Sequence, residues 1–153
     1  LDGKAPVQVI WQTGKFYERE MREFLAEHPT ENIWQGAFIE RMDYAYAAAN
    51  VVLSRSGACT VSELCLVAKP TIFVPSPNVS EDHQTKNAMA LVEKGAAEIV
   101  RDNEAVAKGM KEAVALALDE ERLEMLSANI AQLAINDSAA RVVEVIDEEL
   151  KRG

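Results

Sequence analysis

The stretch from residue 50 to residue 63, NVVLSRSGACTVSE, holds the residues of this sequence that are best suited to bind an anion. A short β-branched run ends at Ser54, a turn containing Gly57 follows, and a helical pattern begins at Ala58 or Cys59. The first amides of a helix have no internal partner and carry partial positive charge. A strand that opens a helix in this way is therefore a candidate site for a phosphate group.

Polar side chains strengthen this candidate site. Thr60 and Ser62 offer hydroxyl groups, and Glu63 offers a carboxylate one turn into the helix. The stretch contains neither a GxGxxG motif nor a P-loop, so residue types alone are also compatible with an ordinary strand-turn-helix junction.

Two further turns follow predicted strands. Residues 12–15, QTGK, open a helix and could contact an anion or form a plain turn. Phe38 and Ile39 stand where the second predicted strand ends, and main-chain groups there could recognise the edge of a planar base. Packing in the core is the alternative for both of these apolar residues.

A polar loop leads into another helix at residues 75–87, PSPNVSEDHQTKN. His83, Gln84 and Asn87 lie on roughly one face of that helix. They could donate and accept hydrogen bonds with a hydroxyl-rich ligand such as a sugar. His83 could also be a surface or capping histidine.

Composition excludes several classes of function. The chain has 153 residues with a globular composition and a net charge of −9, which argues against a broad nucleic-acid surface. Cys59 and Cys65 stand six residues apart on one helix and are poorly placed to bridge. Since no DxD triplet and no zinc-type cluster occurs, we predict no metal and no cofactor.

Strands and helices alternate along the predicted chain. Predicted strands cover 7–11, 33–38, 50–54, 71–74 and 97–100, and predicted helices cover 16–28, 41–49, 58–68, 81–94, 104–118, 120–134 and 138–151. This order predicts a Rossmann-like α/β fold, with one parallel sheet and helices on both faces. We expect the strand at 7–11 to be buried on both faces. Ligands of such sheets bind beyond the carboxyl ends of the strands, where the turns described above lie.

The motifs RSGA-x-TVSE, P-x-x-FVP and HQ-x-x-NA, at this spacing, resemble the MurG family of peptidoglycan N-acetylglucosaminyltransferases. The resemblance extends over residues 7–150 and includes VIWQTGK at residues 9–15. The wider class is the two-domain GT-B glycosyltransferases. The resemblance implies that this chain is the C-terminal half, which binds the UDP-GlcNAc donor.

The resemblance also implies a role for each candidate residue. Ile39 would hold the uracil through its main chain, beside Phe38 and Met42. The segment that would surround the diphosphate and the ribose consists of Ala58, Cys59, Thr60, Val61, Ser62 and Glu63. Within this segment, Thr60 would contact phosphate and Glu63 would bind the ribose hydroxyls. Cys59 stands where the family leads us to expect leucine, and its main-chain role would be preserved.

The sugar would be bound from the third motif. Gln84, helped by His83 and Asn87, would bind the GlcNAc hydroxyls. Thr13 would lie near the diphosphate or the sugar.

Two parts of the family pattern are absent. The C-terminal half of the family begins with a further strand and a Gly-rich turn of the GGS-x-GA kind, so we expect this chain to lack its first strand. The N-terminal half, which would bind lipid I, touch the membrane and supply the catalytic base, is absent too. We therefore expect a piece of a longer protein that is inactive alone, with its catalytic residues in the missing half.

The whole enzyme implied by the resemblance would transfer GlcNAc to lipid I and form lipid II. The transfer would invert the anomeric carbon without a metal. The enzyme would work at the cytoplasmic face of the bacterial inner membrane, as a peripheral protein with no nucleic-acid partner. Two alternatives stay open: another GT-B UDP-sugar enzyme, such as a glycosyltransferase or an epimerase, or a non-catalytic nucleotide-binding module. The HQ-x-x-NA helix argues against the epimerase.

Overall fold

The computed structural model describes residues 6–77 and 83–134. The predicted helix at 138–151 lies outside the described residues. Parallel strands alternate with helices, as predicted. The elements are β1 (Val9–Gln12), α1 (Gly14–Glu27), β2 (Ile33–Gly36), α2 (Met42–Ala48), β3 (Val52–Ser54), α3 (Ala58–Leu66), β4 (Thr71–Phe73), α4 (His83–Val92), β5 (Glu98–Ile99), α5 (Asp102–Glu104), a π-helical turn (Ala105–Gly109), α6 (Met110–Ala117) and α7 (Glu120–Ala131).

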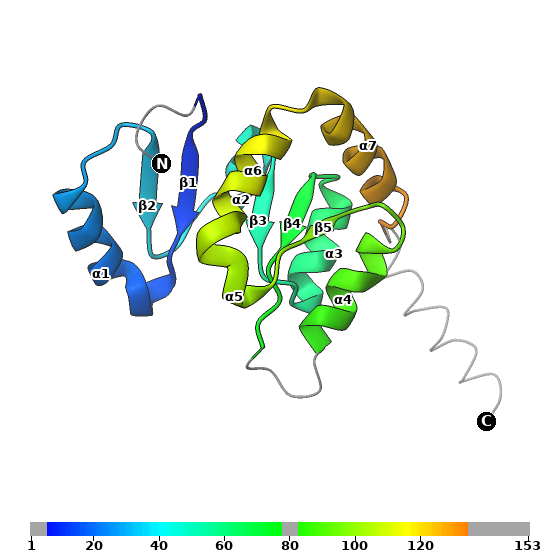
Figure 1. The fold of residues 1–153 in the computed structure, drawn as a ribbon, viewed down its shortest axis with the longest axis horizontal. Helices are drawn as coiled ribbons and strands as arrows, with labels where there is room; N and C mark the ends of the chain where they lie inside the picture. Colours follow the sequence, from blue (N-terminus) through cyan, green and yellow to red (C-terminus); the bar gives the residue numbers. More distant parts are fainter. Residues whose placement is uncertain (1–5, 78–82, 135–153) are drawn as a thin grey trace.

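The strands form two parallel sheets, where the sequence predicted one (Figure 1). β1 pairs with β2, in a register that joins Val9 to Ile33. β4 lies between β3 and β5 in the second sheet, with Phe73 opposite both Ser54 and Ile99. The order β2–β1 followed by β3–β4–β5 matches the doubly wound order 3-2-1-4-5-6 with position 1 vacant among the described residues. The vacant position separates β1 from β3 and accounts for the division.

The expectation that the first strand is buried on both faces is wrong. Ile10 and Trp11 of β1 are 48% and 37% exposed, and Leu53 of β3 is 39% exposed. Among the described residues, no strand pairs with the second edge of β1 or of β3. Apolar side chains along these two edges therefore stay partly open to solvent.

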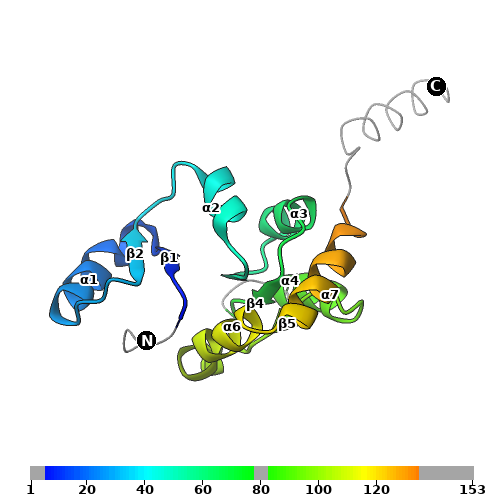
Figure 2. The same cartoon turned by 90° about the horizontal axis from the view of Figure 1, so that it is seen from above.

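The second sheet carries the core, and its two faces are covered by different helices. Successive residues of a strand point to opposite faces. Phe73 packs in a cluster with Leu64 of α3 and Leu91 of α4, whereas Ile72 packs with Leu116 of α6. Figure 2 shows α3 and α6 on opposite sides of this sheet. The prediction of a parallel α/β sheet with helices on both faces is confirmed here.

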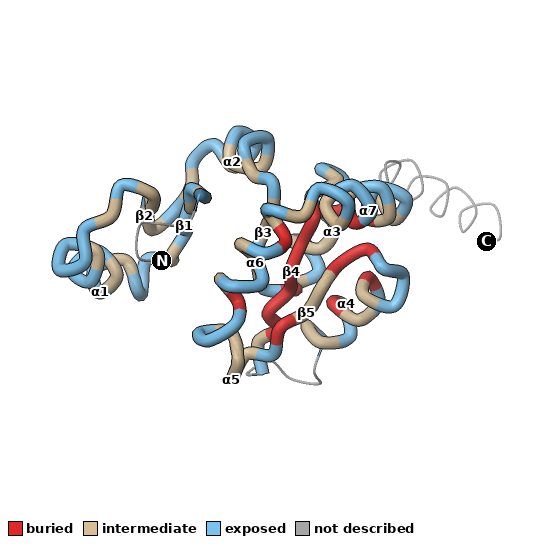
Figure 3. Tube along the Cα trace, turned by 45° about the horizontal axis from the view of Figure 1, so that its top comes forward, coloured by how far each residue is buried: buried red, intermediate tan, exposed pale blue. Residues whose placement is uncertain are grey.

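Burial is uneven along the chain. β4 is buried at all three of its positions, whereas α1 and α2 contain no buried residue. Figure 3 shows the buried segments gathered around β4 and β5. The three-stranded sheet is therefore the rigid support for the loops that follow its strands. No helix among the described residues is long and apolar enough to span a bilayer.

Candidate functional site

The N-terminus of α3 is the centre of the candidate site. Gly57 precedes the helix in an extended conformation (φ −62°, ψ 147°), and no described side chain caps the first turn. The Ser62 hydroxyl donates to the carbonyl oxygen of Ala58 at 3.0 Å. Because the opening amides of α3 lack a side-chain cap, the helix presents them to a ligand with partial positive charge.

Gly57 leaves space in front of these amides. A Cβ atom built at this position would find no other atom within 4 Å. The φ of −62° is one that any residue adopts, so the main chain itself does not demand glycine. A ligand can therefore approach the main chain closely here.

Glu63 lies one turn into α3 and has a partner from α2. The Tyr46 hydroxyl donates to Glu63 Oε2 at 3.3 Å. Burial raises the pKa of Tyr46, and the nearby Glu63 charge raises this pKa further. Tyr46 therefore keeps its proton at neutral pH and helps to orient the carboxylate. The sequence reasoning missed Tyr46; the available signal was a polar aromatic within an alanine-rich helix.

Gln84 and Asn87 of α4 face the same junction. Asn87 Nδ2 donates to the carbonyl oxygen of Ser56 at 3.0 Å, and the Ser56 hydroxyl donates to the carbonyl oxygen of Gln84 at 2.8 Å. The Ser76 amide donates to Gln84 Oε1 at 2.9 Å. The loops after β3 and β4 are thus tied to the first two turns of α4, which begins at His83.

Arg55 joins the same loops to α5. Its guanidinium donates to the carbonyl oxygen of Val74 at 3.0 Å and forms an ion pair with Asp102. Three segments that follow β3, β4 and β5 are linked through this one side chain. Neither Arg55 nor Ser56 was a sequence candidate, because no periodicity marks a loop residue whose partners lie far along the chain.

The predicted base-binding residues lie at the end of the other sheet. The main-chain amide of Ile39 donates to Gln12 Oε1 at 2.9 Å. Phe38 is 66% exposed, and Met42 begins α2. An apolar hollow of about 390 Å³ adjoins Ile39, and its lining residues are Ile10, Trp34, Ile39, Tyr44 and Ala45.

Thr13 follows β1 of this first sheet and is the N-cap residue of α1. The side chain of Gln35 donates to Thr13 Oγ1 at 3.0 Å, and Thr13 Oγ1 lies 3.3 Å from the carbonyl oxygen of Gly36. The sequence-predicted set is thus divided: Thr13, Phe38 and Ile39 follow the strands of the first sheet, and residues 58–63 follow those of the second. In Figure 1 the strands of both sheets have their carboxyl ends on the same side of the molecule.

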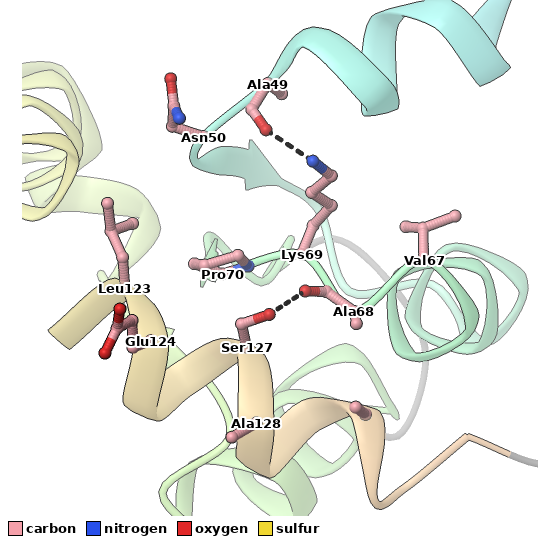
Figure 4. A pocket seen from close by; sticks show the side chains of 11 residues that line it. Ala49, Asn50, Val67, Ala68, Lys69, Pro70, Leu123, Glu124, Ser127 and Ala128 are labelled. Carbon is pink, nitrogen blue, oxygen red and sulfur yellow. Dashed lines mark hydrogen bonds between the residues drawn. The ribbon is translucent and has the colours of Figure 1, made fainter. Parts of the chain in front are cut away.

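A larger hollow of about 610 Å³ lies at the opposite, amino-terminal end of β3 and β4 (Figure 4). Lys69 Nζ donates there to the carbonyl oxygen of Ala49 at 2.8 Å, and the Ser127 hydroxyl donates to that of Ala68 at 2.8 Å. None of the candidate residues lines this hollow. No group of three or more potential metal ligands occurs within residues 6–77 and 83–134.

Comparisons with known sequences agree on one family. The sequence profile described as "Glycosyltransferase family 28 C-terminal domain" matches residues 1–142. A relative from Parabacteroides distasonis is 51% identical over 93% of this chain and 39% of its own length. One from Porphyromonas gingivalis is 50% identical over 94% of this chain and 38% of its own. Both are named UDP-N-acetylglucosamine--N-acetylmuramyl-(pentapeptide) pyrophosphoryl-undecaprenol N-acetylglucosamine transferase. The chain thus spans about two fifths of these relatives.

Solved structures show the same architecture. The crystal structure of Acinetobacter baumannii MurG matches 95% of this chain and 46% of its own, with a TM-score of 0.79 and 27% identity. The calicheamicin glycosyltransferase CalG4 matches 98% of this chain and 37% of its own, with a TM-score of 0.72. At 20% identity, this second match concerns the fold alone.

Proposed function

This chain belongs to the family of glycosyltransferase family 28 C-terminal domains, and from that premise we propose that it binds UDP-GlcNAc as the donor half of a lipid II synthase. The support comes from relatives about half identical to it whose names describe GlcNAc transfer to a muramyl-pyrophosphoryl-undecaprenol. The similarity to a MurG crystal structure supports the same proposal.

The observation that carries the proposal is the open N-terminus of α3. Its amides bind the diphosphate of the donor, and the absence of a side chain at Gly57 lets the phosphates reach them. As the bond from GlcNAc to UDP breaks, negative charge grows on the leaving diphosphate. Fixed amides and the helix dipole stabilise that charge without first having to reorganise.

The other candidate residues bind the two ends of the donor. Glu63, oriented by Tyr46, accepts hydrogen bonds from the ribose hydroxyls. Gln84 binds the hexose, and the Ile39 main chain with Phe38 and Met42 holds the uracil.

The rest of the reaction belongs to the remainder of the enzyme. That part binds lipid I, contacts the cytoplasmic face of the membrane and supplies the base that deprotonates the C4 hydroxyl of MurNAc. Attack by this hydroxyl on the anomeric carbon, opposite the leaving UDP, inverts the configuration.

Donor preference tests the proposal. The chain is titrated with UDP-GlcNAc, UDP-glucose and UDP-galactose in a calorimeter, and the intact enzyme is assayed with a lipid I analogue. We expect UDP-GlcNAc to bind most tightly and its GlcNAc to appear on the lipid. Tighter binding of another UDP-hexose would favour a different GT-B glycosyltransferase. Binding of nucleotide without any transfer by the intact protein would favour a non-catalytic module.

A further inference from the structure

Ser56 is a fully buried polar residue at the junction of two helices. Its side chain has no exposed surface. Its hydroxyl donates to the carbonyl oxygen of Gln84 at 2.8 Å, and its own carbonyl oxygen accepts from Asn87 Nδ2 at 3.0 Å. Both the side chain and the main chain of this one residue are thus bonded to α4.

Ser56 stands at the start of α3 in the chain, so its hydrogen bonds to α4 connect the starts of two helices. It directly precedes Gly57, the residue from which α3 starts. Gln84 and Asn87 lie in the first two turns of α4. One buried residue therefore fixes the start of α4 against the start of α3.

The loop after β4 is attached to the same place. The Ser76 amide donates to Gln84 Oε1 at 2.9 Å, so the Gln84 main chain is tied to Ser56 and its side chain to Ser76. The orientation of this amide group is thereby set by two loops that follow neighbouring strands. A shift of α4 would have to break these partly buried hydrogen bonds and leave the fully buried Ser56 hydroxyl unpaired, which is costly.

We propose that Ser56 is a positioning residue that sets the separation between the diphosphate-binding start of α3 and the sugar-binding start of α4. The inference rests on the proposed function and deepens it. Asn87 acts in this arrangement through the Ser56 carbonyl group, as a second positioning residue. The diphosphate needs only the amides of α3, whereas the hexose needs α4 at the correct distance from them.

The test compares binding of UDP with binding of UDP-GlcNAc in the Ser56→Ala variant of the full chain. UDP lacks the hexose, so its affinity should change by less than about twofold. UDP-GlcNAc should bind about 2- to 12-fold more weakly, the loss that corresponds to one neutral hydrogen bond. The measured quantity is the affinity for UDP-GlcNAc divided by the affinity for UDP. A general loss of stability would leave this ratio unchanged.

Ser127→Ala is the matched control. It removes a serine hydroxyl that also donates to a main-chain carbonyl oxygen at 2.8 Å, but at the opposite end of the sheet. This control should leave the ratio of affinities unchanged. Ser56→Cys keeps a side chain of similar shape, slightly larger and with a much weaker donor, and should weaken UDP-GlcNAc binding relative to UDP as alanine does, so it serves if Ser56→Ala does not fold.

One outcome would overturn the inference: an unchanged ratio of the two affinities in both Ser56 variants, whether UDP and UDP-GlcNAc lose affinity equally or neither loses any. The proposed function is tested by a different measurement. If it were wrong, the unmodified chain would show no preference for UDP-GlcNAc over other UDP-hexoses.

Discussion

Gln12 Oε1 accepts a hydrogen bond from the main-chain amide of Ile39 at 2.9 Å. The two residues lie 27 positions apart: Gln12 is the last residue of β1, and Ile39 follows β2. In the proposed site the Ile39 main chain recognises the uracil, whose carbonyl groups accept hydrogen bonds as the Gln12 amide does. In the protein without ligand, the Gln12 side chain therefore occupies the Ile39 N–H group that the uracil would need.

This competition predicts a tighter site when Gln12 is shortened. In Gln12→Ala the Ile39 amide is free for the ligand, and UDP should bind more tightly by up to about tenfold, the net worth of one hydrogen bond. Calorimetric titration with UDP measures the change. Gln132→Ala, at the exposed end of α7, is the control. Weaker UDP binding in Gln12→Ala would show that Gln12 supports the site.

Gly57 should matter to the ligand and not to the fold. With φ at −62° and no atom within 4 Å of an added Cβ, Gly57→Ala should fold normally, with stability unchanged or raised by about 0.4–1 kcal/mol. Its methyl group would stand before the opening amides of α3. We expect UDP-GlcNAc to bind at least about tenfold more weakly, which is close to the lower end of the range for one lost charge-assisted hydrogen bond.

Gly14 provides the contrast for this variant. It begins α1 at a φ of +74°, which an L side chain rarely adopts. Gly14→Ala should therefore lower the thermal midpoint of unfolding, whereas Gly57→Ala should not. If Gly57→Ala kept full affinity for UDP-GlcNAc, close approach of the phosphates at this residue would be ruled out.

The carboxylate of Glu63 should contribute directly to binding. Glu63→Ala removes the group assigned to the ribose hydroxyls and should weaken UDP-GlcNAc binding by about 1–3 kcal/mol, the range for a charged hydrogen-bond partner. Calorimetry with UDP-GlcNAc measures this loss. Glu124→Ala, at the opposite end of the sheet, is the matched control. Equal affinities in the two variants would contradict the ribose assignment.

The contact between Tyr46 and Glu63 should be visible as a shifted phenol titration. Burial is the larger cause that raises the pKa of Tyr46, and the Glu63 charge is the second. A raised pKa means that the folded protein favours the protonated phenol. The stability from this contact is therefore complete below the ordinary value of about 10 and is lost as the pH rises through the folded pKa.

Ultraviolet or NMR titration of the Tyr46 phenol measures this pKa. In Glu63→Gln the pKa should move part of the way back towards about 10, because burial remains. A Tyr46 pKa at or below that of a free phenol in the unmodified chain would mean that the two side chains do not meet.

Local sequence patterns predicted the central part of the fold. The apolar run at 71–74 became β4, and α3 begins at Ala58, one of the two predicted starts. Both features depend on near neighbours in the chain: β-branched and aromatic residues in the strand, and a small-residue turn before the helix. Alternation along β4 then sends Ile72 and Phe73 to opposite faces.

Long-range relationships could not be predicted in this way. The apolar character of β1 indicates burial, but full burial depends on a strand at its second edge, away from β2, which none of the described residues supplies. Ser56 is bonded to Gln84 and Asn87, which lie 28 and 31 positions further along the chain. No periodic pattern signals a loop residue that acts through such partners.

The central claim is that the start of α3 and the start of α4 form one binding site for UDP-GlcNAc, with the Ile39 main chain at its base end. The most direct test follows the backbone amide NMR signals of the chain during titration with UDP-GlcNAc. We expect saturable shifts at Ile39, residues 58–63 and Gln84, with little change at Ser127. Shifts confined to the hollow around Ser127, or none at residues 58–63 at saturating ligand, would contradict this claim.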